Sequence, residues 1–409
     1  MREMKDSGNV WYGNIPYAWE LNKIKYLTTI RSESAIYNPE EDKYIGLENV
    51  NGYSDNVVET DTEYDYSMQS ICKKNDILFS KLRPYLAKVF IAKHNSFCTG
   101  EFIVFSSFNG DRRYLFYSIL NPKFIENINS STYGAKMPRA NPQYIFDQQI
   151  CLPSLVEQQR IAEFLDRECG KIDGLKEDIQ SQIDTLEQYK RSVITEAVTH
   201  GLNPSAPMKD SGIPWVGKTP EYWKVGRIGG LYELRNQKVS DKDFMPLSVT
   251  MKGILPQLET AAKTNDGDNR KLVRMGDFAI NSRSDRRGSC GISDYDGSVS
   301  LINTILKPRN RMNAKYYNWL FHTPMFADEF YKWGHGIVDD LWTTNWSEMK
   351  RISIPFPPLD EQQEIADYLD NKCAEIEQII ADKKTQIETL DGYKKSLIYE
   401  YVTGKKEVG

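Results

Sequence analysis

The sequence predicts an α+β protein in which two mixed α/β domains form a tandem pseudo-repeat, separated by two long helices packed as an antiparallel coiled coil. Two observations predict this fold. The stretch LPSLVEQQRIAEFLDRECGKIDGL begins at Leu152 and returns as FPPLDEQQEIADYLDNKCAEIEQI from Phe356, 204 residues later. Both copies open long segments with a sevenfold apolar repeat. Solenoid repeats have periods of roughly 20–50 residues, so this spacing indicates a duplicated half-protein instead.

A second pair of matching segments sets the extent of the repeat. MKDSGNVWYGNIPYAW from Met4 matches MKDSGIPWVGKTPEYW from Met208, again 204 residues apart. Between the anchors the similarity nearly vanishes, although NDILFSKLR from Asn75 faintly matches GDFAINSRS from Gly276. Each half is therefore a variable body followed by a preserved tail. We expect the bodies at residues 1–155 and 204–358, and the helical tails at 156–203 and 359–409.

The bodies have the composition of mixed α/β domains. KYIGLENV, DILFSKL, KVFIAK and EFIVFSSF have strand-like lengths and are bounded by Gly, Asn and Asp. RRYLFYSIL and AKYYNWLFHTPMFADEFYKW are rich in aromatic residues and predict helices.

The tails have the periodicity of coiled-coil helices. Ser154 with Glu157 predicts a capping box at the start of the first helix, Gly201 predicts its end, and Gly404 predicts the end of the second. Cys169 and Cys373 match across the repeat and are expected to be small buried side chains. Steps of seven pass through Leu165, Ile172, Ile179, Leu186 and Val193, and through Leu369, Ile376, Lys383, Leu390 and Leu397. A second series is expected to complete the stripe: Leu175, Ile183 and Tyr189, with Ile379, Ile387 and Tyr393.

Composition places the chain among cytoplasmic globular proteins. Hydrophobic residues make up 40% and charged residues 27% of the 409 residues, and no apolar run approaches the roughly 18 residues of a membrane span. The N-terminal residues contain no apolar run of the kind found in signal peptides. The six cysteines form no CxxC pair, so we expect reduced thiols and no metal site.

The distribution of charge is compatible with DNA binding in the bodies. The whole chain carries −5, but residues 204–358 have 22 basic against 17 acidic side chains, and the acidic excess lies in the tails. Arginine suits phosphates and guanine edges, and asparagine suits adenine. Solvated surface loops are the alternative interpretation of the same clusters. The candidate DNA-binding residues are Lys81, Arg83, Tyr85, Lys88, Lys136 and Arg139 in the first body, and Asn281, Arg283, Arg286, Arg287, His335 and Asn345 in the second.

Catalytic motifs are missing. No G-x-x-x-x-G-K-[ST] phosphate loop is present. NPKF at Asn121 and NPQY at Asn141 are near misses of the Asn-Pro-Pro-Tyr motif of amino-methyltransferases, and no Gly-rich loop precedes them to hold S-adenosylmethionine. Glu348-Met349-Lys350 resembles the end of a nuclease motif without a convincing upstream Asp partner. We expect no catalytic residues and no cofactor in this chain.

At this point the residues resemble a known family. KDSGIPWVGKTPEYW, DILFSKLRPYLAKV, LPSLVEQQRIAEFLD and PFPPLDEQQEIADYLD are similar to the specificity (S) subunit of type I restriction–modification systems, over essentially the whole chain. The resemblance implies that each body is a target-recognition domain for double-stranded DNA, and that the tails space the two domains. It implies a non-catalytic subunit that binds two methyltransferase subunits, which methylate adenine with S-adenosylmethionine. It also implies motor-nuclease subunits that use ATP and Mg.

The resemblance gives the preserved motifs a role. Because the two bodies differ, we expect an asymmetric bipartite target. Lys383 departs from the apolar stripe, and either relaxes the coil locally or faces an acidic group of a partner. The residues expected to orient the bodies or to meet the methyltransferase subunits are Glu157, Gln158 and Gln159, with Glu361, Gln362 and Gln363. The alternative is that these six residues only cap and solvate the first helical turns.

Three other functions fit parts of the sequence. A stand-alone modification complex without a nuclease subunit would use the same chain. A fragment of a single-chain restriction enzyme would require fused methyltransferase and nuclease domains, which the sequence lacks. A coiled-coil scaffold that binds only protein would leave the Arg- and Asn-rich loops unexplained, and would show no salt-dependent affinity for DNA.

Overall fold

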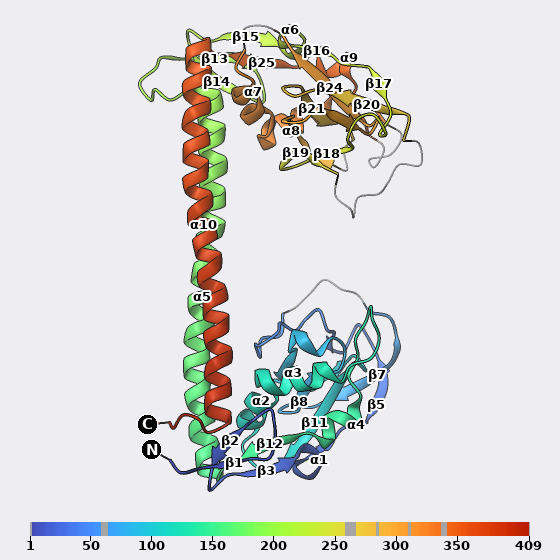
Figure 1. The fold of residues 1–409 in the computed structure, drawn as a ribbon, viewed down its shortest axis with the longest axis vertical. Helices are drawn as coiled ribbons and strands as arrows, with labels where there is room; N and C mark the ends of the chain where they lie inside the picture. Colours follow the sequence, from blue (N-terminus) through green and yellow to red (C-terminus); the bar gives the residue numbers. More distant parts are fainter. Residues whose placement is uncertain are drawn as a thin grey trace. The chain divides into compact units, whose positions relative to one another are not determined.

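A computed structural model of the chain describes residues 2–58, 64–257, 267–283, 286–309, 312–336 and 342–408. The chain divides into two compact units, Met1–Gln180 with Lys384–Gly409, and Ser181–Lys383. Each unit contains one variable body and one half of each long helix (Figure 1). The α+β class, the tandem bodies and the antiparallel pair of long helices are confirmed.

The first body contains strands, short helices and one 3-10 turn. Its elements are β1 (Met4–Asp6), β2 (Asn14–Pro16), β3 (Glu20–Lys23), α1 (Ile24–Leu27), β4 (Thr28–Ile30), β5 (Ser34–Tyr37), β6 (Tyr44–Ile45), β7 (Ser67–Cys72), β8 (Ile77–Ser80), η1 (Pro84–Leu86), β9 (Val89–Ile91), β10 (Ser96–Cys98), β11 (Phe102–Phe108), α2 (Arg112–Leu120), α3 (Pro122–Ser130), α4 (Pro142–Asp147) and β12 (Gln149–Leu152).

The centre of the first body is a sheet buried on both faces. Its strand order is β4-β11-β8-β9, and all neighbours are antiparallel. Along β8, Ile77 and Phe79 join the core that contains α2 and α3, whereas Leu78 joins a second core next to the sheet β5-β7-β10-β6. Successive side chains of a strand leave opposite faces, so burial of both faces explains the uninterrupted apolar run in this segment.

The second body repeats this plan with different side chains. Its elements are β13 (Met208–Ile213), β14 (Gly217–Pro220), β15 (Lys224–Arg227), α6 (Ile228–Leu231), β16 (Tyr232–Leu234), β17 (Lys238–Val239), β18 (Leu247–Thr250), β19 (Gly253–Pro256), β20 (Arg270–Val273), β21 (Phe278–Asn281), β22 (Cys290–Ile292), β23 (Gly297–Val299), β24 (Asn303–Pro308), α7 (Ala314–Phe321), α8 (Pro324–Lys332), α9 (Trp346–Met349) and β25 (Ser353–Phe356).

The central sheet of the second body has the order β16-β24-β21-β22, which corresponds strand by strand to the first. Along β21, Phe278 and Ile280 join the core with α7 and α8, and Ala279 joins the core on the opposite face. The outer two-stranded pair β15-β25 corresponds likewise to β3-β12. The two bodies therefore share one arrangement of strands, although their sequences scarcely match.

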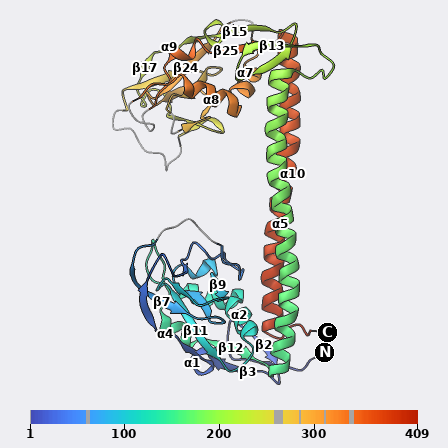
Figure 2. The ribbon, with the colours of Figure 1, turned by 180° about the vertical axis from the view of Figure 1, so that it is seen from behind.

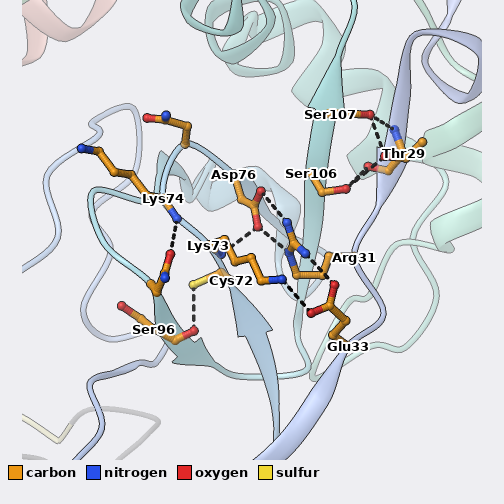
Figure 3. Close-up of polar contacts among 12 residues, drawn as sticks. Thr29, Arg31, Glu33, Cys72, Lys73, Lys74, Asp76, Ser96, Ser106 and Ser107 are labelled. Carbon is orange, nitrogen blue, oxygen red and sulfur yellow. Dashed lines mark hydrogen bonds and ion pairs between the residues drawn. The ribbon is translucent and has the colours of Figure 1, made fainter.

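One buried ion pair explains the faint match between the bodies. Arg31 Nε donates to Asp76 Oδ2 at 2.7 Å, and Arg31 Nη2 donates to Asp76 Oδ1 at 3.2 Å (Figure 3). The hydrogen bond that Arg31 donates to the Asp76 carboxylate raises the pKa of Arg31 above its ordinary value. Arg235 and Asp277 form the same two-pronged pair in the second body. Each Asp follows a turn residue with positive φ, Asn75 or Gly276, which is why those short segments still match.

The preserved tails form helices α5 (Leu155–His200) and α10 (Leu359–Val402). Gly201 and Gly404 follow the helix ends with φ of +76° and +69°, so both predicted ends are confirmed. Figures 1 and 2 show the two helices side by side and antiparallel. In the first unit Lys394 Nζ lies 2.6 Å from Asp173 Oδ2, and in the second unit Lys190 pairs with Glu377.

The side chains buried between α5 and α10 form the seam of the coil. They confirm the predicted sevenfold series and correct the predicted second series. Leu165, Ile172, Leu369 and Ile376 are buried, and the matched Cys169 and Cys373 are each 3% exposed as expected. Of the predicted second series, Ile183 is buried and Ile387 is half-buried. The remaining four, Leu175, Tyr189, Ile379 and Tyr393, were predicted to be buried, but their side chains are exposed.

The reason is that the second seam series lies four residues after each member of the first. It consists of Cys169, Lys176, Ile183, Lys190 and Ala197 on α5, and of Cys373, Ile380, Ile387, Lys394 and Tyr401 on α10. Lysine occupies three of these ten places, so counting apolar residues misses the series. Each of the three finds a carboxylate on the facing helix: Lys176 with Asp391, Lys190 with Glu377, and Lys394 with Asp173. Lys383, in the first series, donates to Gln182 at 2.5 Å.

Candidate nucleic-acid interface

The two predicted clusters of the first body, Lys81–Lys88 and Lys136–Arg139, meet at one junction. Leu82, just after β8, bridges to Arg139, and Arg139 also bridges to Tyr133. Tyr133 and Arg139 exchange both backbone hydrogen bonds, at 3.2 and 3.0 Å. Residues 133–139 are thus a hairpin loop whose base is attached to the end of the central strand. Segments about 50 residues apart in sequence are brought to one place on the body.

The second body builds the same junction from unrelated residues. Arg283, just after β21, bridges to Thr343, and Thr343 also bridges to His335. His335 and Thr343 exchange both backbone hydrogen bonds, at 3.0 and 3.1 Å. The residues 337–341 between them lie outside the described residues. The predicted segments around Arg283 and His335 therefore meet at the position that corresponds to the first body's junction.

The turn that carries Arg83 and Tyr85 is held by its backbone. Arg83 has φ of +50° and donates its N–H to the carbonyl of Pro138 at 2.7 Å. The 3-10 turn η1 follows at once and leaves Tyr85 49% exposed. Arg83 and Lys136 are also exposed. This local geometry presents one arginine, one lysine and one tyrosine beside the hairpin loop.

Several candidates have structural partners inside their body. Lys88 Nζ donates to the carbonyl of Leu47 at 2.6 Å. Arg139 Nη2 donates to Glu101 Oε1 at 2.7 Å. Lys81 is half-buried and is held through its backbone, and Asn281 is 5% exposed.

Asn281 Oδ1 accepts the backbone N–H of Arg283 at 3.0 Å and so shapes the start of the loop. These four candidates, Lys81, Lys88, Arg139 and Asn281, are therefore half-buried or buried in their bodies, unlike the exposed candidates.

The remaining candidates of the second body are exposed or partly exposed around its junction. Arg287 Nη1 lies 3.0 Å from Asp328 Oδ1, and its guanidinium lies 5.3 Å from the ring centroid of Tyr331. Arg286 and His335 are exposed, and Arg283 is half-buried. Asn345 is exposed and is the N-cap of α9. Its backbone carbonyl accepts the first hydrogen bond of that helix, from the N–H of Met349.

Two exposed residues of the first junction are not among the DNA-binding residues predicted from the sequence. Tyr133 is 60% exposed and Met137 is 58% exposed, both on the hairpin loop. Apolar residues in an unknown sequence are more readily assigned to a core, and only the neighbouring Gly134 and Pro138 indicate a loop.

The first Glu-Gln-Gln motif joins its body to both long helices. Glu157, in the first turn of α5, accepts the indole N–H of Trp19 at 3.0 Å and also pairs with Arg2. A Cβ added at Gly404, just after α10, would lie 3.0 Å from the same indole ring. Trp19 thus contacts the start of one helix and the end of the other. The predicted capping box is only half formed, because Ser154 accepts the N–H of Glu157 but the Glu157 carboxylate turns to the indole.

The second residue of the motif is buried and satisfies two backbone groups. Gln158 is 3% exposed, donates to the carbonyl of Pro153 at 2.9 Å and accepts the N–H of Asp111 at 3.0 Å. Asp111 is the N-cap of α2, so Gln158 ties α5 to the first helix of the body. The third residue, Gln159, is exposed.

The second copy repeats these contacts. Glu361 accepts the indole N–H of Trp223 at 2.8 Å, and Gly201 packs against the same ring. Gln362 is 4% exposed, donates to Pro357 O and accepts the N–H of Asn313, the N-cap of α7. Gln363 is exposed and accepts from Asn313 Nδ2 at 2.7 Å. Glu157, Gln158, Glu361 and Gln362 therefore each form hydrogen bonds between a long helix and the body of their unit.

The comparison with known families follows the same two halves. Residues 19–185 and 220–389 match the family described as type I restriction modification DNA specificity domain. The chain belongs to this family. Each match covers most of one body and enters the helix that follows it, as the repeat predicts.

Related specificity subunits cover most of the chain at low identity. The type I restriction enzyme MjaVIII specificity subunit of Methanocaldococcus jannaschii is 24% identical over 73% of this chain and 71% of its own length. The putative MjaX specificity subunit of the same organism is 24% identical over 97% and 95%. A chain in a structure addressing complex assembly and conformational transition of a type I restriction–modification system has a TM-score of 0.70, 15% identity, and coverage of 96% and 99%. The HsdS subunit from Thermoanaerobacter tengcongensis has a TM-score of 0.51 at 16% identity, with coverage of 96% and 98%.

As a type I specificity subunit, the chain has the role of DNA recognition and is the non-catalytic component of its system. Within the described ranges, no three His, Cys, Asp or Glu side chains gather as a metal site. In the same part of the chain, no helix has the length and apolarity needed to cross a membrane.

Proposed function

We propose that this specificity subunit reads an asymmetric DNA target through two different half-sites, one for each body. The supporting observation is that one scaffold carries two unlike junctions. Arg83, Tyr85 and Lys136 are exposed at the first junction, whereas Arg286 and His335 are exposed at the second. Side chains of different hydrogen-bonding capacity select different base edges, so a shared scaffold with unlike side chains predicts unlike half-sites.

The second part of the proposal is that partner subunits dock on the coiled coil, at exposed apolar side chains beside its buried seam. We call this surface the flank. When the first seam series is taken as the d positions and the second as the a positions of the heptads, Leu175, Tyr189, Ile379 and Tyr393 occupy g positions. Side chains at g positions make contacts outside the seam. The Lys176–Asp391 pair places Leu175 at the level of Tyr393, and the Lys190–Glu377 pair places Tyr189 at the level of Ile379. Each unit thus presents one aliphatic and one tyrosine side chain.

These two apolar pairs favour equivalent partners. Leu175 matches Ile379 and Tyr189 matches Tyr393 across the 204-residue repeat, so the antiparallel coil presents the same surface twice. Two methyltransferase subunits would occupy the two copies. They would bring S-adenosylmethionine, and motor-nuclease subunits would bring the ATP and Mg chemistry, all acting on double-stranded DNA in the cytoplasm. The specificity chain itself would hold no cofactor.

A body exchange tests the reading function. In the variant, residues 204–358 replace residues 1–155, and the assembled complex is used to select targets from random double-stranded DNA. The selected target is expected to become an inverted repeat of the second half-site, because both readers are then the same. Recovery of the original asymmetric target, or of no target while the unmodified complex selects one, would contradict the proposal. A chain that binds protein but selects no DNA would support the scaffold alternative.

Single substitutions on the flank test the docking. Tyr189→Ser and Tyr393→Ser are each expected to reduce the bound methyltransferase subunits from two to one, and the double variant to none, by native mass spectrometry. Tyr66→Ser is the control, since Tyr66 is 60% exposed and belongs to the first body rather than to either long helix. Two bound subunits in the double variant would place the docking surface elsewhere.

A further inference from the structure

The hairpin loop 133–139 has a fixed base and an exposed tip. The base is held by the two backbone hydrogen bonds between Tyr133 and Arg139 and by the Arg139–Glu101 ion pair. On the strand side, Ala140 donates to the carbonyl of Lys81 at 2.8 Å. Because the base of the loop is bonded to the end of a central strand, the central sheet sets the position of the tip.

The tip turns tightly. Gly134 has φ of +92°, and a Cβ there would lie 3.1 Å from the carbonyl oxygen of Met137. Residues 133–137 are all exposed, with Tyr133 at 60% and Met137 at 58%. The exposed tyrosine and methionine, both on one loop with a fixed base, give this loop apolar surface that a binding partner can cover.

The second body repeats the base of the loop and carries a different sequence beyond it. Thr344 donates to the carbonyl of Ser282 at 3.0 Å, as Ala140 donates to Lys81, and His335 and Thr343 close the loop as Tyr133 and Arg139 do. The sequences STYGAKMPRA and WGHGIVDDLWTT at these loops share almost nothing, and the second is longer by two residues. A constant base with a variable tip is the arrangement expected of an element that changes specificity without changing the fold.

We propose that the tip of hairpin loop 133–139 reads base edges in the major groove, with Met137 making an apolar contact and Lys136 a polar one. The proposal rests on the DNA-reading function proposed above. The major groove admits a two-stranded ribbon, and each thymine presents a methyl group there that an apolar side chain can contact. Lys136 carries donors that suit guanine acceptors. Arg139 is a positioning residue, because its guanidinium is bound to Glu101.

The test compares Met137→Ser and Lys136→Ser with the control Met68→Ser in the complete complex. Met68 is a matched control, since it is 65% exposed on β7 of the same body, outside the loop. Targets are selected from random DNA, and binding to the preferred target and to single-base variants of it is measured for each protein. Thermal melting of each variant checks that the fold is retained.

In the two loop variants, discrimination at one or two positions of one half-site is expected to fall by about tenfold or more. The other half-site, the spacer and the affinity for unrelated DNA are expected to change little. Unchanged discrimination at every position in both loop variants would overturn the proposal, as would an equal loss in Met68→Ser. An unmodified complex without any sequence preference would instead overturn the proposed DNA-reading function itself.

Discussion

The ammonium of Lys394 lies 2.6 Å from the Asp173 carboxylate on the facing helix, and the Lys394 side chain is only 5% exposed. The matching pair in the second unit, Lys190 with Glu377, is more open, with side chains 24% and 64% exposed. The repeat therefore provides the same ion pair in two degrees of burial.

Removal of the carboxylate should have unequal effects in the two pairs. Asp173→Ala leaves the Lys394 ammonium without its partner in a buried seam, and we expect the free energy of unfolding to fall by about 3 kcal/mol. Glu377→Ala removes an exposed partner and should cost less than about 1 kcal/mol. Urea titrations followed by circular dichroism measure both. Equal losses would show that burial of the lysine does not govern the effect.

The Gln residues of the first motif offer a matched pair of adjacent substitutions. Gln158→Ala leaves the Pro153 carbonyl and the Asp111 N–H without their side-chain partner, and should lower the free energy of unfolding by about 2 kcal/mol. Gln159→Ala alters an exposed side chain and should stay within about 0.5 kcal/mol. A larger loss in Gln159→Ala than in Gln158→Ala would refute the structural role of the buried residue.

Salt dependence should separate phosphate contacts from other surface charge. Arg83→Gln and Arg286→Gln are each expected to weaken binding and to lower the log–log salt slope by about one, as the loss of a phosphate contact would. The control is Arg167→Gln, since Arg167 lies on α5 and pairs with Glu168. Fluorescence anisotropy at several salt concentrations provides the slopes. A slope that changes only in the control would contradict the assignment of the junctions to DNA.

The buried thiols predict a loss of stability at alkaline pH. Burial raises the pKa of Cys151 and of Cys169 from 9.0 to about 12. Between these values the unfolded chain has released protons that the folded chain still holds, so stability falls as pH rises from 9 toward 12 and is fully present below pH 9. Denaturation midpoints at pH 8, 9.5 and 10.5 check the sign. A midpoint that rises over this range would contradict it.

The length of the coil should set the separation of the half-sites. Deletion of residues 179–185 and of the facing residues 382–388 removes one heptad from each helix and preserves the seam. Seven residues shorten a helix by about 10 Å, which corresponds to about three base pairs. We expect the spacer in the selected target to shorten while both half-sites persist. An unchanged spacer would show that the coil does not space the readers.

The sequence could predict those parts of the fold whose residues repeat. The segments around Trp19 and Glu157 recur 204 residues later. The hydrogen bond from the tryptophan to the glutamate is made once in each unit, so both units contain the same two segments. The sevenfold series was visible because it is mostly apolar. The second seam series was not, since Lys176, Lys190 and Lys394 reach carboxylates across the seam and resemble surface residues in sequence.

The candidate site was only partly predictable for a similar reason. The basic loops were found by composition, but composition does not separate exposed Arg83 from Arg139, whose guanidinium is bound to Glu101. Tyr133 and Met137 carry no charge, and their exposure depends on a loop base formed by distant residues. Contacts between segments far apart in sequence decide these roles.

Methylation-site sequencing of DNA from a host that carries this chain with its methyltransferase subunit tests the central claim most directly. We predict one motif with two unlike halves, a constant spacer and N6-methyladenine in each half. A symmetric motif would contradict the proposal that the two bodies read different half-sites. Absence of any motif, in an assembled complex that binds S-adenosylmethionine, would contradict the reading function.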